Sequence, residues 1–169
     1  MFNTIILLAA CEEYHLALTA LLREHNPGLS VCAGSDASDL DTLEPELLRN
    51  ARLVCFDGEI TLDDDLLAQI GHGAYQFYAA PLQYPGLPPE PHRAFDDGPC
   101  MSVIAQALTE RPSDQIVGLE TFVIPPGIET PQRDRLVFSR LAHLFWQMSR
   151  AIACDSRLNG LGTSSATRH

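Results

Sequence analysis

The sequence predicts a single α/β domain with a mostly parallel, Rossmann-type sheet and helices on both faces. Short apolar runs alternate with amphipathic helical segments through the first eighty residues. The chain has 169 residues and is 46% hydrophobic, which suits one domain with its own core. Two later strand-like runs follow each other too closely for a crossover helix. This pair predicts an antiparallel C-terminal edge.

The first elements are justified by their apolar patterns and stop signals. Thr4–Ala10 is continuously apolar, as expected of a strand buried on both faces. Glu12–His25 has an apolar helical face and ends before a Pro-Gly stop signal. Leu29–Ala33 is predicted to be a second strand. Asp39 is predicted to cap a helix that extends to Arg49.

The next segment repeats the alternation. Leu53–Phe56 predicts a third strand, and Thr61 is predicted to cap a helix that ends at Ile70. Three aspartates early in this helix suit its dipole. Two glycines then end the helix, and Ala74–Tyr78 predicts a fourth strand.

The remaining elements follow a segment of different character. Pro81–Pro99 is too rich in proline and glycine for a helix or a central strand, so a long loop is expected. Met101–Ala107 and Ile116–Ile124 are the two antiparallel strands, and Thr130 with Pro131 begins a helix extending to Ala153. The domain is therefore expected to span residues 1–154, with 155–169 as a flexible tail.

Charge and cysteine content exclude several functional classes. Eleven Lys+Arg against 22 Asp+Glu give a net charge of −11, which disfavours nucleic acid and anionic membranes as partners. All eleven cations are arginine, which excludes Walker A loops and Schiff-base chemistry. Five scattered cysteines without a CxxC predict reduced thiols and no metal site. Without a signal-like N-terminus or an apolar run of about 18 residues, the chain is expected to be cytoplasmic.

One motif resembles that of a known family. Gly73–Gly86 (GAYQFYAAPLQYPG) is similar to the Gly-x-Tyr-Asn-Phe-His-Pro-Gly-Pro-Pro-x-Tyr-Pro-Gly motif of the folate-dependent formyltransferases. The resemblance implies the fold of the N-terminal domain of methionyl-tRNA and glycinamide ribonucleotide formyltransferases, and a role in one-carbon metabolism. The similarity continues, in order and spacing, through Arg52–Leu67, Pro91–Gly98, Ile116–Gly127, Arg135-Leu136 and Leu144-Phe145-Trp146.

The catalytic positions implied by the resemblance depart from the family pattern. The family uses an asparagine and a histidine for the oxyanion, and an aspartate that orients the histidine and relays protons. Here these positions hold Gln76, Tyr78 and Pro112, and only a short shift of the alignment brings Asp114 into the aspartate's place. At pH 7 only about one tyrosine in a thousand is a phenolate. Gln76 places its amide one methylene further from the backbone than an asparagine would, and displacing such a group by about 1 Å can cost roughly a hundredfold in rate. A degenerate active site, that of a pseudoenzyme, is therefore expected.

The same resemblance implies that cofactor binding can persist where catalysis is lost. In the similar enzymes the loop after the third strand contacts the pterin largely through backbone atoms. The corresponding residues, which we expect to contact 10-formyltetrahydrofolate if it binds, are Phe56, Asp57, Gly58, Glu59 and Ile60.

Histidines and tyrosines near the motif each have two interpretations. His72 and His92 are candidates to replace the lost imidazole, or else lie at a helix end and in a solvent-facing loop. Tyr75, Tyr78 and Tyr84 are expected to cluster, either as a ligand platform or as filling for the vacated pocket.

Two functional hypotheses follow. The first is a non-catalytic binding or regulatory protein that associates with itself or with an active paralogue. The alternative is an active formyltransferase that moves a formyl group from 10-formyltetrahydrofolate to a small-molecule amine, using Gln76, Tyr78 and Asp114. Another chemistry in the same cleft, such as hydrolysis, has no residue that singles it out. Transfer RNA is not expected as an acceptor, because the chain is acidic.

Overall fold

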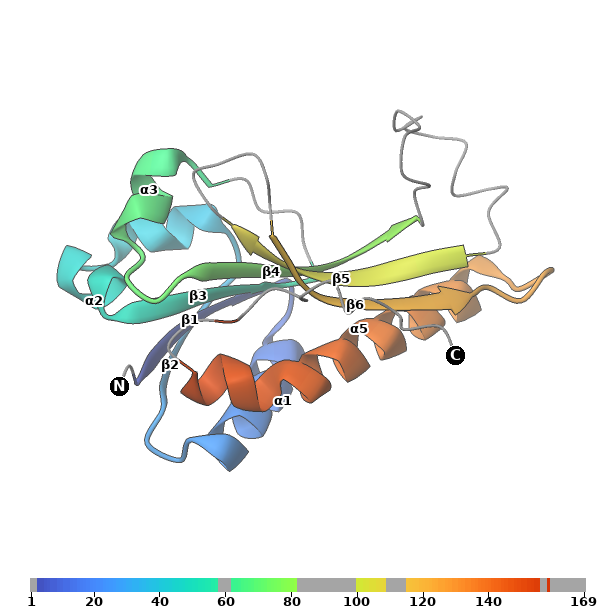
Figure 1. Cartoon of the computed structure of the whole chain (residues 1–169), viewed down its shortest axis with the longest axis horizontal. Coiled ribbons are helices and arrows are strands. Elements are labelled where there is room, and N and C mark those ends of the chain that lie inside the picture. The colour runs from blue at the N-terminus through green and yellow to red at the C-terminus, as the bar shows by residue number, and fades with distance from the viewer. Residues whose placement is uncertain (1–2, 58–61, 82–99, 109–114, 156–157, 159–169) are drawn as a thin grey trace, which may run out of the picture.

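The computed structural model describes residues 3–57, 62–81, 100–108, 115–155 and 158. They form one mixed sheet with helices on both faces, as expected (Figure 1). None of the described helices is long and apolar enough to cross a membrane. In chain order the elements are β1 Thr4–Ala9, α1 Glu12–His25, β2 Ser30–Gly34, the 3₁₀ helix η1 Ala37–Thr42, α2 Pro45–Arg49, β3 Ala51–Phe56, α3 Asp64–Gln69, β4 Ala74–Pro81, β5 Cys100–Leu108, β6 Gln115–Val123 and α5 Thr130–Cys154.

The six strands lie in the order β2-β1-β3-β4-β5-β6. The first four are parallel, and β5 and β6 pair antiparallel with their neighbours. The predicted antiparallel C-terminal edge is thus confirmed. β1 and β3 are buried almost throughout because both of their faces are covered, which explains their continuous apolar sequences.

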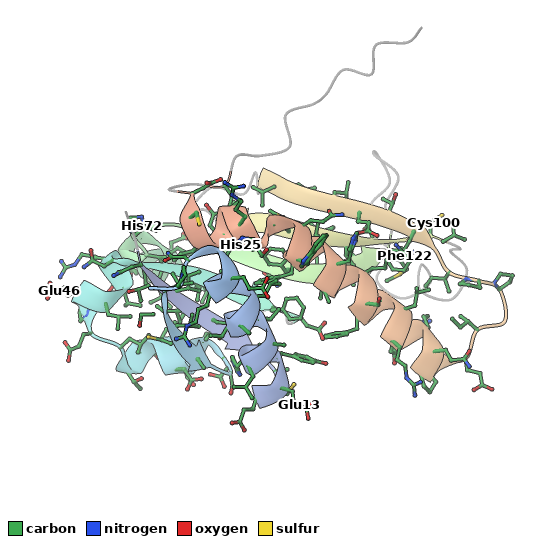
Figure 2. The ribbon with its side chains drawn as sticks, turned by 90° about the horizontal axis from the view of Figure 1, so that it is seen from below. Glu13, His25, Glu46, His72, Cys100 and Phe122 are labelled. Carbon is green, nitrogen blue, oxygen red and sulfur yellow. The ribbon has the colours of Figure 1, made fainter. Side chains whose placement is uncertain are left out.

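Helices cover the two faces unequally. Helices α1 and α5 pack on one face of the sheet (Figures 1 and 2). In the core between them and the sheet, the rings of Phe56, Phe77 and Phe145 contact one another. On the opposite face, η1, α2 and α3 cover β1 and β3, with Leu8 and Leu53 in that second core. On this face α3 also lies above the start of β4, where Ala74 and the paired Leu108 belong to the second core, and no described helix lies over the rest of β4–β6 (Figure 1).

Two predicted helix caps are wrong. The helix expected from Asp39 to Arg49 is two short helices, because Pro45 has no N–H and disfavours the helical conformation at Glu44. Asp36 caps the first of them, and Asp39 is its third residue, whose side chain completes a capping box.

The cap of α3 is Asp63, whose side chain accepts a hydrogen bond from the Leu66 amide at 2.7 Å. Thr61, the predicted cap, lies outside the described residues. Asp64 and Asp65 are in the first turn of this helix, as expected.

A buried arginine joins the C-terminal end of α5 to the sheet. Arg52 on β3 is fully buried, and its guanidinium donates to the carbonyls of His72, Ala151, Ile152 and Asp155. Beyond the helix, the Leu158 amide donates to the Tyr75 hydroxyl at 3.1 Å, and Leu158 is buried. The boundary at residue 154 remains a prediction, but Asp155 and Leu158 are attached to the domain.

The sheet and α5 approach each other closely at Gly118 on β6. A Cβ atom added there would lie 2.5 Å from the Met148 Sδ and 3.2 Å from the Ala105 Cβ. A register shift between Ala105 and Gln106 puts Val117 and Gly118 both on the α5 side. The absence of a side chain at Gly118 therefore allows this spacing.

Candidate functional site

The two described catalytic candidates lie on one face of β4. Successive strand residues point to opposite faces, so Gln76 and Tyr78 point away from α5, whereas Tyr75 and Phe77 point toward it. Gln76 is paired in register with Cys55 on β3 and with Gln106 on β5. The candidate site is therefore the part of β4 after Ala74 on the face away from α5, where parallel β4 meets antiparallel β5.

The tyrosine hydroxyl is held by a neighbouring strand. The Tyr78 Oη donates to the Gln106 Oε1 over 2.6 Å. Gln76, which lies opposite Gln106, is only 8% exposed. Because a phenol has one proton, this hydrogen bond directs the donor capacity of Tyr78 to Gln106.

Cys55 on β3 lies beside Gln76 in the sheet, on the side opposite Gln106. It is fully buried, and burial raises the pKa of its thiol to about 12. Cysteine is nucleophilic as the thiolate, so this side chain is a neutral core group near pH 7. It therefore adds no nucleophile to the site.

The expected cofactor loop is described only at its start. Phe56 is 1% exposed, and its ring contacts those of Tyr14, Phe77, Phe138 and Phe145. Its side chain therefore belongs to the core and does not fit a pterin contact. Gly58, Glu59 and Ile60 lie outside the described residues, as do Pro112 and Asp114.

Asp57 is the described residue of this loop that has an unusual backbone. Its φ is 56°, in the left-handed region that few residues other than glycine adopt. Its amide donates to the Phe77 carbonyl at 3.0 Å, and burial raises the pKa of its carboxyl group. A pterin could therefore be held here by the Asp57 carboxylate and by backbone groups, but not by the Phe56 ring.

His72 does not replace the missing imidazole. It lies in the turn before β4, and Figure 2 shows it at the opposite end of the sheet from Cys100. Tyr78 lies four residues after the start of β4 at Ala74, about 13 Å along the strand, and His72 precedes that start. Burial and the nearby Arg52 guanidinium lower the pKa of His72. His92 lies outside the described residues.

The expected tyrosine cluster is not formed by its two described members. Tyr75 is in the core beside Arg52, whose guanidinium carbon lies 5.3 Å from the ring centre, whereas Tyr78 is on the other face of β4. Alternation along the strand separates them, and Tyr84 lies outside the described residues. Among the described residues, no group of three or more His, Cys, Asp or Glu is arranged to hold a metal ion.

Solved structures that match this architecture include formyltransferases. The formyltransferase PseJ from Anoxybacillus kamchatkensis, solved with a UDP-formamido sugar and tetrahydrofolate, has a TM-score of 0.65 at 13% identity, over 94% of this chain and 80% of that chain. Phosphoribosylglycinamide formyltransferase from Anaplasma phagocytophilum has a TM-score of 0.62 at 9% identity, over 96% and 95%. This chain has the formyltransferase fold.

A methionyl-tRNA formyltransferase from Clostridium thermocellum shares the formyltransferase fold at a TM-score of 0.55 and 10% identity. The likeness covers 86% of this chain but only 61% of that one. No protein-family model matches the sequence, and no curated protein sequence does. The formyltransferase fold is thus recognised here from three-dimensional structure and from the motif, at identities too low to transfer an activity.

Gln106 is the site residue that sequence reasoning missed. It lies 28 positions after Tyr78, and the two meet only because β5 pairs antiparallel with β4. The antiparallel pair of β5 and β6 was predictable, but the register of β5 against β4 was not. No motif in the sequence indicates this contact.

Proposed function

We propose that this protein is a non-catalytic binding or regulatory protein with the formyltransferase fold. The observation that carries the proposal is the hydrogen bond from Tyr78 to Gln106 at the family's histidine position. Formyl transfer to an amine needs donors for an oxyanion and an acceptor for the amine proton. A phenol whose proton is bonded to an amide oxygen is poorly suited to both tasks.

The neighbouring groups support the same conclusion. Gln76 is nearly buried at the family's asparagine position, and the adjacent Cys55 thiol is neutral. Loss of one oxyanion donor typically costs about 10²–10³ in rate, and the residues of one catalytic group are not independent. The described residues thus favour a scaffold that has kept its fold without this chemistry.

A formyl-transfer assay tests the proposal. The full chain is incubated with 10-formyltetrahydrofolate and a panel of amino sugars and amino-acid amines, and formylated products are measured by mass spectrometry. No product above the protein-free rate is expected. Turnover that is lost in Tyr78→Phe, but kept in the exposed-site control Thr121→Ala, would overturn the proposal.

The ligand of such a protein is a separate question. When bound, 10-formyltetrahydrofolate would supply a formyl group, and Asp57 with the adjacent backbone would hold its pterin. Calorimetric titration with a stable analogue of this compound measures that binding directly. Micromolar affinity, lowered in Asp57→Ala, supports a folate-binding role. No binding at millimolar analogue supports regulation through association with itself or with an active paralogue.

One observation favours the alternative function. This chain is similar in structure to PseJ, which was solved with a formamido nucleotide sugar and tetrahydrofolate, over 80% of the length of PseJ. The alternative is an active formyltransferase for a small-molecule amine, in which Gln76 and Tyr78 act with Asp114. A UDP-4-amino sugar belongs in the amine panel for this reason, because its formylation would select the alternative.

A further inference from the structure

A cavity of about 320 Å³ lies at the carboxyl ends of β1 and β2. It is separate from the candidate site, because β3 lies between β1 and β4. This volume is at the lower end of the range for small-molecule sites. Its floor is apolar and consists of Ile6, Leu8 and Leu40, which are almost fully buried.

His15 contributes a hydrogen-bond acceptor to this cavity. Its Nε2 lies 2.8 Å from the Gly34 carbonyl oxygen. A carbonyl only accepts, so Nε2 carries the hydrogen, and in the neutral ring Nδ1 is then an acceptor. Within the described part of the chain, Nδ1 has no hydrogen-bond partner.

Asp39 contributes a negatively charged acceptor. Its Oδ2 accepts hydrogen bonds from the Ser35 amide at 2.5 Å and the Asp36 amide at 3.3 Å. Its Oδ1 accepts none from the residues that the structure describes. A Cβ added at Gly34 would lie 3.1 Å from Oδ2 and 2.6 Å from the Leu8 Cδ2, so glycine allows the carboxylate to lie against the strand end.

These groups select the charge of a ligand. The cavity is lined by the exposed carboxylate of Asp39 and the half-buried imidazole of His15, beside apolar side chains, and among the described residues that line it there is no arginine. An ammonium group carries the charge complementary to the Asp39 carboxylate and can donate to a neutral imidazole, whereas a carboxylate or phosphate would be repelled. We propose that this cavity binds a small primary amine, with its ammonium group at Asp39 and His15 and its apolar body against Leu43.

Benzylamine is a suitable probe, with benzyl alcohol and benzoate as isosteric controls. Titration into ¹⁵N-labelled protein is expected to shift the amide signals of Gly34, Ser35 and Asp39 saturably. Charged hydrogen bonds contribute more than neutral ones, so the two controls should bind at least about tenfold more weakly. Equal binding of benzyl alcohol, or no saturable shift at tens of millimolar benzylamine, would overturn the proposal.

Two matched variants locate the amine. Asp39→Asn keeps an oxygen for the two amides but removes the charge, and should weaken benzylamine binding about tenfold or more. Asp41→Asn removes an exposed charge of the same 3₁₀ helix that does not line the cavity, and should change the affinity by less than about twofold.

A third variant guards against a folding defect in the first. Leu43→Phe fills part of the cavity without touching a charge, and should also abolish binding while unfolding at a temperature near that of the wild type. Equal losses in Asp39→Asn and Asp41→Asn, or full binding by Leu43→Phe, would contradict the assignment. Because the benzylamine titration measures binding and not formyl transfer, its outcome is independent of the proposed function.

Discussion

Arg52 is a fully buried cation whose side chain donates to the ends of other elements. Its donors are directed to backbone carbonyls, three of which lie at the C-terminal end of α5. Those carbonyls lie at the negative end of the helix dipole, and that of Ala151 also accepts the hydrogen bond of the Asp155 amide at 3.0 Å. Burial lowers the pKa of Arg52 below its ordinary value, against the opposing effects of Tyr75 and Asp155. The guanidinium therefore acts as the C-terminal cap of the helix.

Replacement of Arg52 should be strongly destabilising. Arg52→Met leaves buried carbonyls unpaired, which we expect to lower the free energy of unfolding by about 3–5 kcal/mol. Arg52→Lys should recover only part of the loss, because an ammonium lacks the planar fork of donors. Urea unfolding followed by circular dichroism measures both changes.

Arg150 provides the control at the same end of α5. It is exposed, so Arg150→Met should change the free energy of unfolding by less than about 0.5 kcal/mol. If both methionine variants unfold at the same urea concentration, Arg52 does not cap the helix.

At the scale of elements, β6 and α5 are joined by a charged cluster. Glu120 on the edge strand β6 lies 2.9 Å from the Arg140 Nη1 and 3.0 Å from the His143 Nδ1, and the His143 ring stacks on Trp146. An edge strand has one neighbour in the sheet, so contacts to a helix help to hold it. His143 and Arg140 hold the pKa of Glu120 below its ordinary 4.5.

This lowered pKa predicts a specific dependence on pH. The folded state binds the proton of Glu120 more weakly than the unfolded state, so the stabilisation is complete above the ordinary value of 4.5 and is lost as the pH falls through the lowered folded value. Glu120→Gln should remove this part of the acid dependence, at a cost of up to about 1 kcal/mol at pH 7.

Urea unfolding at several pH values between 3 and 7 measures this effect. Glu129→Gln, at an exposed glutamate before α5, is the control and should leave the profile unchanged. Superimposable profiles for Glu120→Gln and the wild type would show that the cluster is not formed in solution.

For the whole molecule, the parts of the fold that depend on local pattern were predictable. The apolar run of β1 and the ends of α1 lie within one residue of their predicted positions, because burial and stop signals are properties of adjacent residues. Pro45, which divides the predicted Asp39–Arg49 helix, is also a local signal in the sequence. The opposite directions of Tyr75 and Tyr78 likewise follow from strand alternation.

The parts of the candidate site that depend on distant pairing could not be predicted. The contact of Gln106 with Tyr78 and the cavity between His15 and Asp39 are each made by separate elements. Their geometry depends on strand register and on how η1 lies against β2, which no local pattern encodes. The motif could indicate the family, but not what its substituted residues contact.

The packing of the two layers makes a further prediction at this scale. Gly118→Val places side-chain atoms where Met148 and Ala105 lie, and should lower the free energy of unfolding by about 1–3 kcal/mol. In a Met148→Ala background the same change should cost at least about 1 kcal/mol less. A double-mutant cycle by thermal unfolding measures this coupling, and Gly28→Ala, at an open position, is the control. Additive effects would contradict it.

This close approach has a consequence for how the sequence can diverge. Because Gly118 has no side chain, β6 and α5 lie so close that neither position 118 nor position 148 can accept a larger residue alone. We expect natural variants with a bulkier residue at 118 to carry a smaller one at 148, so that the two positions evolve as a pair. The edge strand and the long helix would then share one evolutionary constraint, although 30 residues of chain separate their points of contact.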